Sequence, residues 1–163
     1  VARLLAAGAR LDARDSDGWT PLHFAARFNS IEIIGALVDA GADADAQDVD
    51  GWAALHNSAR NGRNRCVTVL LERGASVLVK TRYGETPLHV ACRKGKARVV
   101  QEMVSFSKLA EQRDKGMFGL MLGAQDSDGR NPEEVASSEH IRSILRGNVS
   151  DDGYDMSAGR GPG

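Results

Sequence analysis

Long hydrophobic runs are absent from this 163-residue sequence. The longest apolar stretches, at 33–38 and 116–124, fall short of the roughly 20 residues that span a bilayer, so we expect a soluble protein without a membrane span. An excess of charge of one sign is also lacking, because 21 Lys and Arg face 22 Asp and Glu, for a formal net charge of −1. Such a chain has no general attraction for nucleic acid or an acidic membrane surface, so a charge-driven partner must meet a local patch.

Cysteine is scarce as well: the chain has two, Cys66 and Cys92, without the spacing of a metal site. We interpret them as small buried hydrophobic residues in a reducing compartment, which predicts an intracellular protein, cytoplasmic or nuclear. The sequence also lacks a phosphate-binding loop and a recurring nucleophile–base pair. We therefore expect a protein that is not an enzyme and has no cofactor, metal or small-molecule substrate.

One phrase occurs three times: GWTPLHFAARFN from Gly18, GWAALHNSARNG from Gly51 and GETPLHVACRKG from Gly84, in steps of 33 residues (51 − 18 and 84 − 51). In each unit a Thr-Pro pair or its equivalent precedes a short helix, near 21–28 in the first copy. Apolar residues at three- and four-residue steps predict a second helix. A polar segment that ends in Asp-Gly predicts a hairpin-like turn between units.

The pattern DxxGxTPLHxAA, followed by two helices and Gly-Ala at a period of 33, strongly resembles the ankyrin repeat over about residues 1–106. The resemblance implies an all-α solenoid of stacked helix-turn-helix units with projecting β-hairpin-like turns. A single unit cannot bury its apolar face, so the units must stack on one another to be stable.

We expect one repeat domain over 1–147 and a disordered tail over 148–163. The first segment matches the back half of a repeat, so we expect the sequence to start inside a repeat and to be a fragment of a longer protein. The predicted parts are a partial repeat at 1–14, repeats at 15–47, 48–80 and 81–107, an insertion at 108–125 and a C-terminal capping repeat at 126–147 with helices near 132–137 and 139–146.

Two expectations concern stability. The second repeat has Ala53 in place of the helix-capping Thr, and Asn57-Ser58 where its neighbours have apolar pairs, so we expect it to be the least stable complete repeat. The apolar insertion is expected to shield the exposed end of the third repeat, with a projecting Met-rich contact as the alternative.

His23, His56 and His89 lie 33 residues apart, at one place on the first helix of successive units. A ligand ladder is one reading, but the resemblance implies that each imidazole hydrogen-bonds within its repeat and to the neighbouring turn. We predict a structural role for all three. The recurring Asp pairs, such as Asp48 with Asp50, are interpreted as turn residues and not as a metal or acid–base site.

The resemblance also implies a binding groove made by the turn tips and the exposed side of the first helices. Trp19 and Trp52 occupy equivalent tips, where we expect exposed aromatic contacts for a partner; the alternative is that each lies flat on the adjacent turn. Arg27, Arg60 and Arg93 form a row that suits an acidic ligand, or merely the helix dipole. The candidate binding residues are Trp19, Arg27, Phe28, Trp52, Arg60, Asn61, Arg82, Tyr83, Glu85, Arg93 and Lys94.

These residues predict a monomeric protein–protein interaction module. The expected ligand is a partner protein or peptide, extended and acidic, with hydrophobic side chains. Two alternatives stay open: a targeting or regulatory arm of a larger enzyme, and a basic groove that binds nucleic acid or phospholipid. The net charge and the acidic turns disfavour nucleic acid.

Overall fold

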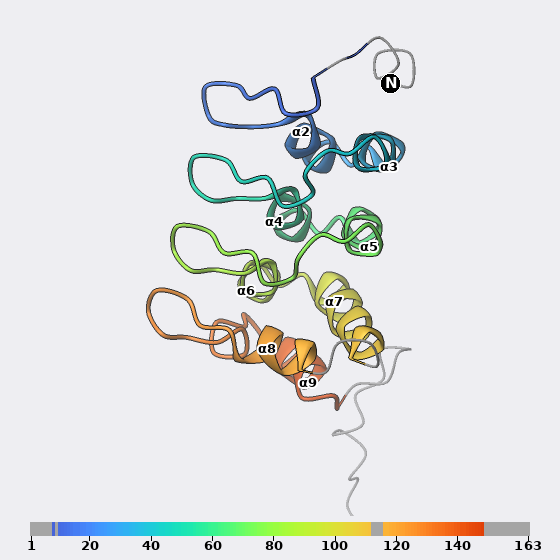
Figure 1. The fold of residues 1–163 in the computed structure, drawn as a ribbon. Helices are drawn as coiled ribbons and strands as arrows, with labels where there is room; N and C mark the ends of the chain where they lie inside the picture. The colour runs from blue at the N-terminus through green and yellow to red at the C-terminus, as the bar shows by residue number, and fades with distance from the viewer. Residues whose placement is uncertain (1–7, 9, 112–115, 149–163) are drawn as a thin grey trace, which may run out of the picture.

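The computed structural model describes residue 8, residues 10–111 and residues 116–148, and in this part all regular structure is helical (Figure 1). Two columns of helices lie side by side, with the turns projecting from one column. The inner column, next to the turns, contains α2 (Pro21–Arg27), α4 (Ala54–Arg60) and α6 (Pro87–Arg93). The outer column contains α3 (Ile31–Asp39), α5 (Asn64–Glu72) and α7 (Ala97–Ala110).

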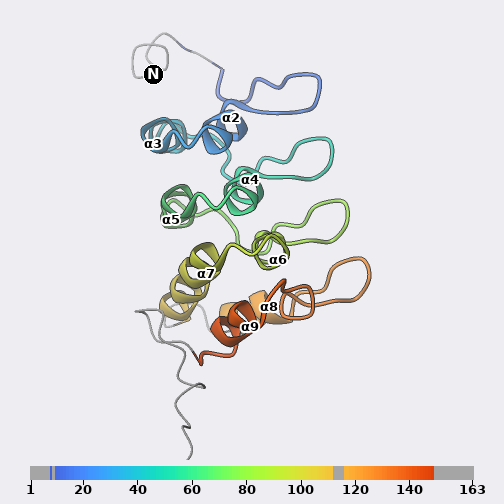
Figure 2. The same ribbon diagram turned by 180° about the vertical axis from the view of Figure 1, so that it is seen from behind.

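Each inner helix packs on the next inner helix, and each outer helix packs on the next outer helix, as Figure 2 shows from behind. The core uses the same positions in every unit. Leu22, Leu55 and Leu88, at steps of 33 residues, are at most 2% exposed. The outer helices contribute Ile34, Val67 and Val100, which are fully buried. The predicted solenoid is therefore confirmed: a periodic apolar pattern builds one continuous core between stacked units.

The projecting turns touch along the stack. The backbone N–H of Val49 donates to the Asp17 carbonyl (3.1 Å), and the N–H of Arg82 donates to the Asp50 carbonyl (2.9 Å). Gly51 lies at this contact with φ of 80°, and a Cβ there would come within 2.8 Å of the Arg82 nitrogen. Only glycine combines this left-handed backbone with such a close approach, so the Asp-Gly signal marks the place where one turn rests on the next.

The three histidines join the units. Nδ1 of His23 accepts from the Thr20 backbone N–H (3.1 Å), and its Nε2–H donates to the Trp52 carbonyl of the next turn (2.8 Å). His56 and His89 make the same pair of contacts, with the carbonyls of Glu85 and Arg130. Burial lowers the pKa of each imidazole, that of His56 to about 4. The rings are neutral connectors between repeats, as predicted.

The C-terminal end departs from the regular repeat. Helix α7 continues to Ala110, as its apolar spacing predicts, and is followed by α8 (Met117–Gly123) and α9 (Glu139–Leu145), both packed on α7. Met121 of α8 is fully buried, with its sulfur 3.1 Å from the Ser107 hydroxyl oxygen, whereas Leu120 is 61% exposed. One face of the insertion thus covers α7.

The prediction of a first helix in the capping repeat, near 132–137, is wrong, because residues 132–135 form turns. The chain has too little length for a helix there, because the Ser137 N–H already donates to the Cys92 carbonyl of α6 (3.1 Å) and Ser138 caps α9. The predicted partial repeat at 1–14 and the predicted tail at 148–163 fall mostly outside the described residues. In the described segments, none of the helices has the length and apolarity needed to cross a membrane.

Candidate functional site

Trp19 and Trp52 each end a turn, one residue before the N-cap of an inner helix. Asp15 and Asp48 fix these turns, because each Oδ1 accepts the Trp N–H at 2.8 Å and the N–H two residues after itself. The Asp pairs therefore serve the turns, as predicted.

Both indoles are half-buried, so they are less exposed than we expected for turn tips. The Trp19 ring lies 5.9 Å from the His23 ring and 5.1 Å from the Phe24 ring, and the Trp52 ring lies 5.7 Å from the His56 ring. Each tryptophan thus packs on the first helix of its own repeat, because it enters that helix directly, and one side of the ring is left toward solvent.

The last residue of each inner helix is an arginine that contacts the residue at the tryptophan position. The guanidinium carbon of Arg27 lies 5.5 Å from the Trp19 ring centre, and that of Arg60 lies 5.6 Å from the Trp52 ring centre. In both cases the spacing is eight residues (27 − 19 and 60 − 52). The tryptophan therefore positions the arginine without neutralising its charge.

In the third repeat the same spacing gives a different contact. Glu85 stands at the tryptophan position and forms an ion pair with Arg93, eight residues later, at 2.8 Å. The Glu85 side chain is only 9% exposed, so it does not present a free carboxylate at the turn tip as its sequence position suggested. Arg82 is paired as well, with Asp50 at 2.8 Å, whereas Tyr83 is 58% exposed.

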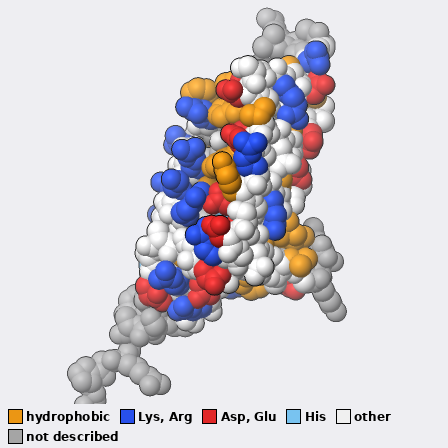
Figure 3. Space-filling view, turned by 90° about the vertical axis from the view of Figure 1, so that its left-hand side faces the viewer, with side chains coloured by type: hydrophobic (Ala, Val, Ile, Leu, Met, Phe, Trp, Pro, Cys, Tyr) orange, Lys and Arg blue, Asp and Glu red, His pale blue; other side chains and the backbone are white. Residues whose placement is uncertain are grey.

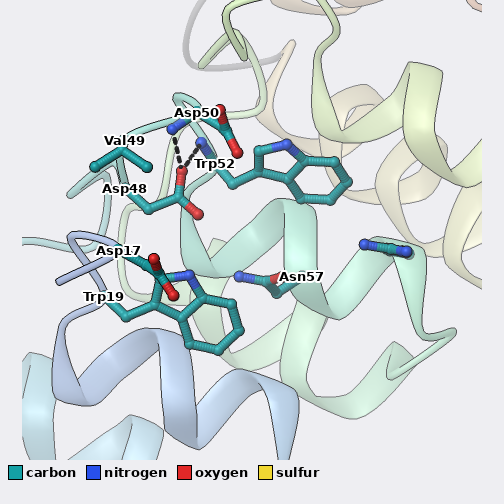
Figure 4. Close-up of a pocket in the computed structure, with 8 residues that line it drawn as sticks. Asp17, Trp19, Asp48, Val49, Asp50, Trp52 and Asn57 are labelled. Carbon is teal, nitrogen blue, oxygen red and sulfur yellow. Dashed lines mark hydrogen bonds between the residues drawn. The ribbon is translucent and has the colours of Figure 1, made fainter. Parts of the chain in front are cut away.

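A hollow of about 350 Å³ separates the two tryptophans (Figure 4). In this view the Asn57 side chain, from α4, lies between the two indole rings, and Asp17 and Asp50 lie at the turns. We call it the aromatic pocket. Its lining residues are Asp17, Trp19, Asp48, Val49, Asp50, Trp52, Asn57 and Arg60.

A second hollow, of about 410 Å³, adjoins the first at the C-terminal ends of α2 and α4. It shares Asn57 and Arg60 with the aromatic pocket, so the two form one groove across the first two complete repeats. We call it the arginine pocket. Its lining residues are Arg27, Phe28, Asn57, Arg60, Asn61 and Arg63.

The predicted binding residues are thus divided. Trp19, Trp52, Arg27, Arg60, Phe28 and Asn61 meet in the two adjoining pockets. Tyr83, Glu85 and Arg93 line a separate hollow with Trp52 and residues of the fourth turn. Neither Arg82 nor Lys94 lines any of these three hollows, although both are exposed.

Sequence reasoning missed Asn57 and Arg63 as lining residues. Asn57 was noticed only as a departure from the apolar residues Phe24 and Val90 at the equivalent positions. That departure was the available signal, because a polar residue at a repeat position that is otherwise apolar needs a reason beyond packing. Arg63 belongs to the loop between α4 and α5 and has no distinguishing pattern.

Charge is distributed unevenly along the groove. Arg27, Arg60 and Arg63 form no ion pair with a carboxylate in the described part of the chain, whereas Arg73, Arg82, Arg93 and Arg130 are all paired. Figure 3, which faces the turn tips, shows Lys and Arg side chains gathered along one side, next to hydrophobic and acidic side chains. The arginine pocket is therefore positive, and the turn side of the aromatic pocket carries carboxylates.

The two cysteines lie away from this groove. Cys66 and Cys92 are both buried, and burial raises their pKa values, that of Cys92 to about 12. Their thiols therefore stay protonated at neutral pH and are not nucleophiles. This agrees with the interpretation of both as small core residues.

Comparison with protein-family models supports the architecture directly. A model described as ankyrin repeats (3 copies) matches residues 1–81, and a model of a single ankyrin repeat matches residues 83–115. A search of curated proteins finds no match to this sequence. The two family matches, the 33-residue period and the stacked helix pairs show that the chain belongs to the ankyrin repeat family.

Proposed function

We propose that this chain binds a segment of a partner protein in the groove formed by the aromatic and arginine pockets. Ankyrin repeats are in general protein–protein interaction modules, and the chain is proposed to act by binding and not by catalysis. The observation that carries the proposal is the continuity of the two pockets. Two half-exposed indoles and three arginines that form no ion pair with any described residue line this one groove across α2 and α4.

The groove is preorganised for binding. The carboxylates of Asp15 and Asp48 accept backbone hydrogen bonds that fix the turns carrying the tryptophans, and the indoles in turn hold the guanidinium groups of Arg27 and Arg60. A partner that binds there orders few additional side chains, so little conformational entropy is lost on association. Aromatic residues and arginine are also the residue types that contribute most to binding at protein interfaces.

The test uses random peptides displayed on phage and selected on the immobilised chain. Selected peptides should bind the Trp52→Ala variant at least roughly tenfold more weakly than wild type, because an interface tryptophan contributes about 2 kcal/mol or more to the binding free energy. Leu109→Ala is the matched control, because Leu109 is 69% exposed on α7, outside the groove. Circular dichroism at the assay temperature must show both variants folded, since Trp52 also packs on His56.

Peptides that bind wild type and both variants equally would contradict the proposal. Peptides weakened only by Leu109→Ala would also contradict it, because they would show that the partner binds the outer helices.

A second candidate is a nucleic acid or phospholipid bound by the arginine pocket. It is favoured by Arg27, Arg60 and Arg63, which have no carboxylate partner in the described part of the chain. The carboxylates of Asp17 and Asp48 in the adjoining pocket oppose it, because they would repel successive phosphates, whereas Asp50 is paired with Arg82. Binding of a single-stranded oligonucleotide or of anionic vesicles that falls steeply with salt and is abolished by Arg60→Glu would favour this candidate. Absence of such binding at low salt would remove it.

A further inference from the structure

Helix α4 contains two buried polar groups without a hydrogen-bond partner among the described residues: Nδ2 of Asn57 and Oγ of Ser58. Asn57 is 6% exposed and Ser58 is fully buried. An unsatisfied buried polar group is destabilising, and native structures contain few of them. Ser58 lines neither pocket, but Asn57 lines both, at the point where the aromatic and arginine pockets meet.

The neighbouring repeats show that packing does not require an amide here. The equivalent residues are Phe24 in α2 and Val90 in α6, and Val90 is fully buried. An apolar side chain at position 57 would avoid the unsatisfied group. Rotation of the Asn57 amide about its last bond exchanges its donor and acceptor, so it can offer either group to a molecule in the groove.

Around Asn57, the positive groups lie at the helix ends. Arg27 and Arg60 are held over indole rings at 5.5 and 5.6 Å, and Arg63 and Asn61 complete the arginine pocket. A guanidinium without a carboxylate partner donates well to a planar acceptor with two oxygens. The site therefore combines positioned cations, an unpaired amide and an adjoining aromatic hollow.

We propose, resting on the function proposed above, that this groove selects an extended partner segment with an apolar or aromatic side chain next to a glutamate or aspartate. The apolar side chain enters the aromatic pocket between Trp19 and Trp52. The carboxylate pairs with the guanidinium groups of the arginine pocket. Asn57 hydrogen-bonds to the main chain of the segment between these two side chains, through the end of its amide that faces the groove.

The lining favours this occupant over others. Small-molecule sites of roughly 300–1,000 Å³ are mostly apolar, whereas these pockets are lined mainly by charged and amide side chains. A phosphate carries more negative charge than a carboxylate, and the Asp17 and Asp48 side chains in the adjoining pocket oppose it. A partner lysine would meet Arg27, Arg60 and Arg63. A single carboxylate beside an apolar side chain matches both pockets.

The first experiment selects random displayed peptides on the whole chain and measures the affinity of a selected peptide. Both tryptophans of the sequence line the aromatic pocket, so their intrinsic fluorescence reports binding without a label. Selected peptides should share an acidic residue beside an aromatic or aliphatic one. Replacing that acid by its amide should weaken binding roughly tenfold or more, as expected for a charge-assisted contact.

Charge reversal locates the carboxylate. Arg63→Glu should weaken binding of the acidic peptide roughly tenfold and should not weaken binding of its amide version. Arg65→Glu is the matched control, because Arg65 is exposed on α5 and lines neither pocket, yet changes the net charge equally. Equal losses for the two variants would mean a long-range charge effect and would overturn the assignment.

The second experiment separates binding from packing at α4. Asn57→Val installs the residue of α6 and should raise the melting temperature while weakening peptide binding at least about fivefold. Ser58→Ala installs the residue found in both neighbouring repeats and should raise the melting temperature with unchanged peptide affinity. If Asn57→Val stabilises the protein and leaves affinity unchanged, the amide is not a binding group and this inference fails.

The outcomes distinguish the inference from the function on which it rests. Selected peptides that depend on Trp52 but lack an acidic residue would leave the protein-binding function standing and overturn the carboxylate subsite. A peptide that binds only when phosphoserine replaces the acid would do the same, in favour of a phosphate. Peptides that bind independently of Trp52 would overturn both.

Discussion

The second and third complete repeats have the same helix pair but use it differently. The third repeat has Thr86 capping α6, the apolar Val90 and Ala91 in the core, and Glu85 paired with Arg93. The second has Ala53, Asn57-Ser58 and Trp52 at these positions, and its Arg60 has no ion pair in the described residues. Every one of these differences lowers the stability of the second repeat or leaves a group available to a partner.

This contrast separates packing from function. A repeat that only had to stack would resemble the third, because capped helices, apolar cores and neutralised charges are all stabilising. The second repeat lies in the middle of the groove, where its departures from that pattern meet Trp19, Arg27 and Arg63. Local rules broken at one place are typical of a functional site.

The largest expected effect comes from acid. The folded pKa of His56 is about 4 against about 6.5 when unfolded, so below pH 6.5 the unfolded chain binds a proton that the folded chain does not. The burial of neutral His56 therefore leaves the unfolding free energy undiminished above pH 6.5 and lowers it by about 3 kcal/mol by pH 4. Urea unfolding at both pH values should show the loss, and hydrogen exchange should show α4 losing protection before α6. An identical pH dependence in His56→Gln would contradict this assignment.

The next effect exchanges the core residues of the two repeats. Asn57→Val with Ser58→Ala should raise the unfolding free energy by about 2 kcal/mol, because two unsatisfied buried polar groups are removed. Val90→Asn with Ala91→Ser should lower it by at least as much. Equilibrium unfolding in urea measures both. If the exchange in the second repeat does not raise the unfolding free energy while the exchange in the third lowers it, the proposed difference between the repeats is wrong.

The helix caps should have a smaller effect. Ala53→Thr gives α4 a capping hydroxyl like the one that Thr86 supplies to α6, and should raise the unfolding free energy by about 1 kcal/mol. Thr86→Ala should lower the unfolding free energy by a similar amount. Thermal unfolding of the two variants, with wild type as the reference, tests the pair. A neutral Ala53→Thr would show that the His56 contact to the Ala53 N–H already satisfies the start of α4.

The arginines should show the smallest effect. Arg60→Ala loses an exposed contact with an indole and should cost about 0.5 kcal/mol. Arg93→Ala leaves the mostly buried Glu85 carboxylate without its cation and should cost about 1 kcal/mol. Raising the salt concentration should change the Arg93 value more than the Arg60 value, since only the former is an ion pair. Equal costs and equal salt responses would remove the distinction between the two arginines.

Much of the fold follows from the sequence. The period, the helix pairs, the turns and the structural histidines depend on contacts that recur in every unit, so each copy reinforces the same prediction. The same pattern predicts a first capping helix, which is absent. The Ser137 N–H is bonded to α6, and too few residues precede it for a helix. The prediction failed where the repeat ends and its neighbours no longer repeat.

The groove was predicted less completely. The sequence shows the arginines and the equivalent tryptophans as residue types at steps of 33. It does not show how buried they are or which groups they contact. Half-burial of the indoles, the withdrawal of Glu85 into an ion pair and the position of Asn57 between two pockets depend on contacts between side chains of different elements.

The sequence by itself determined that copies of one helix pair stack into a solenoid, because the apolar positions recur with the period and cannot be buried in any single unit. Only the tertiary structure decided which of the equivalent arginines keep their charge available. That outcome depends on whether the side chain eight residues earlier is an indole, which holds a cation without neutralising it, or a carboxylate, which neutralises it.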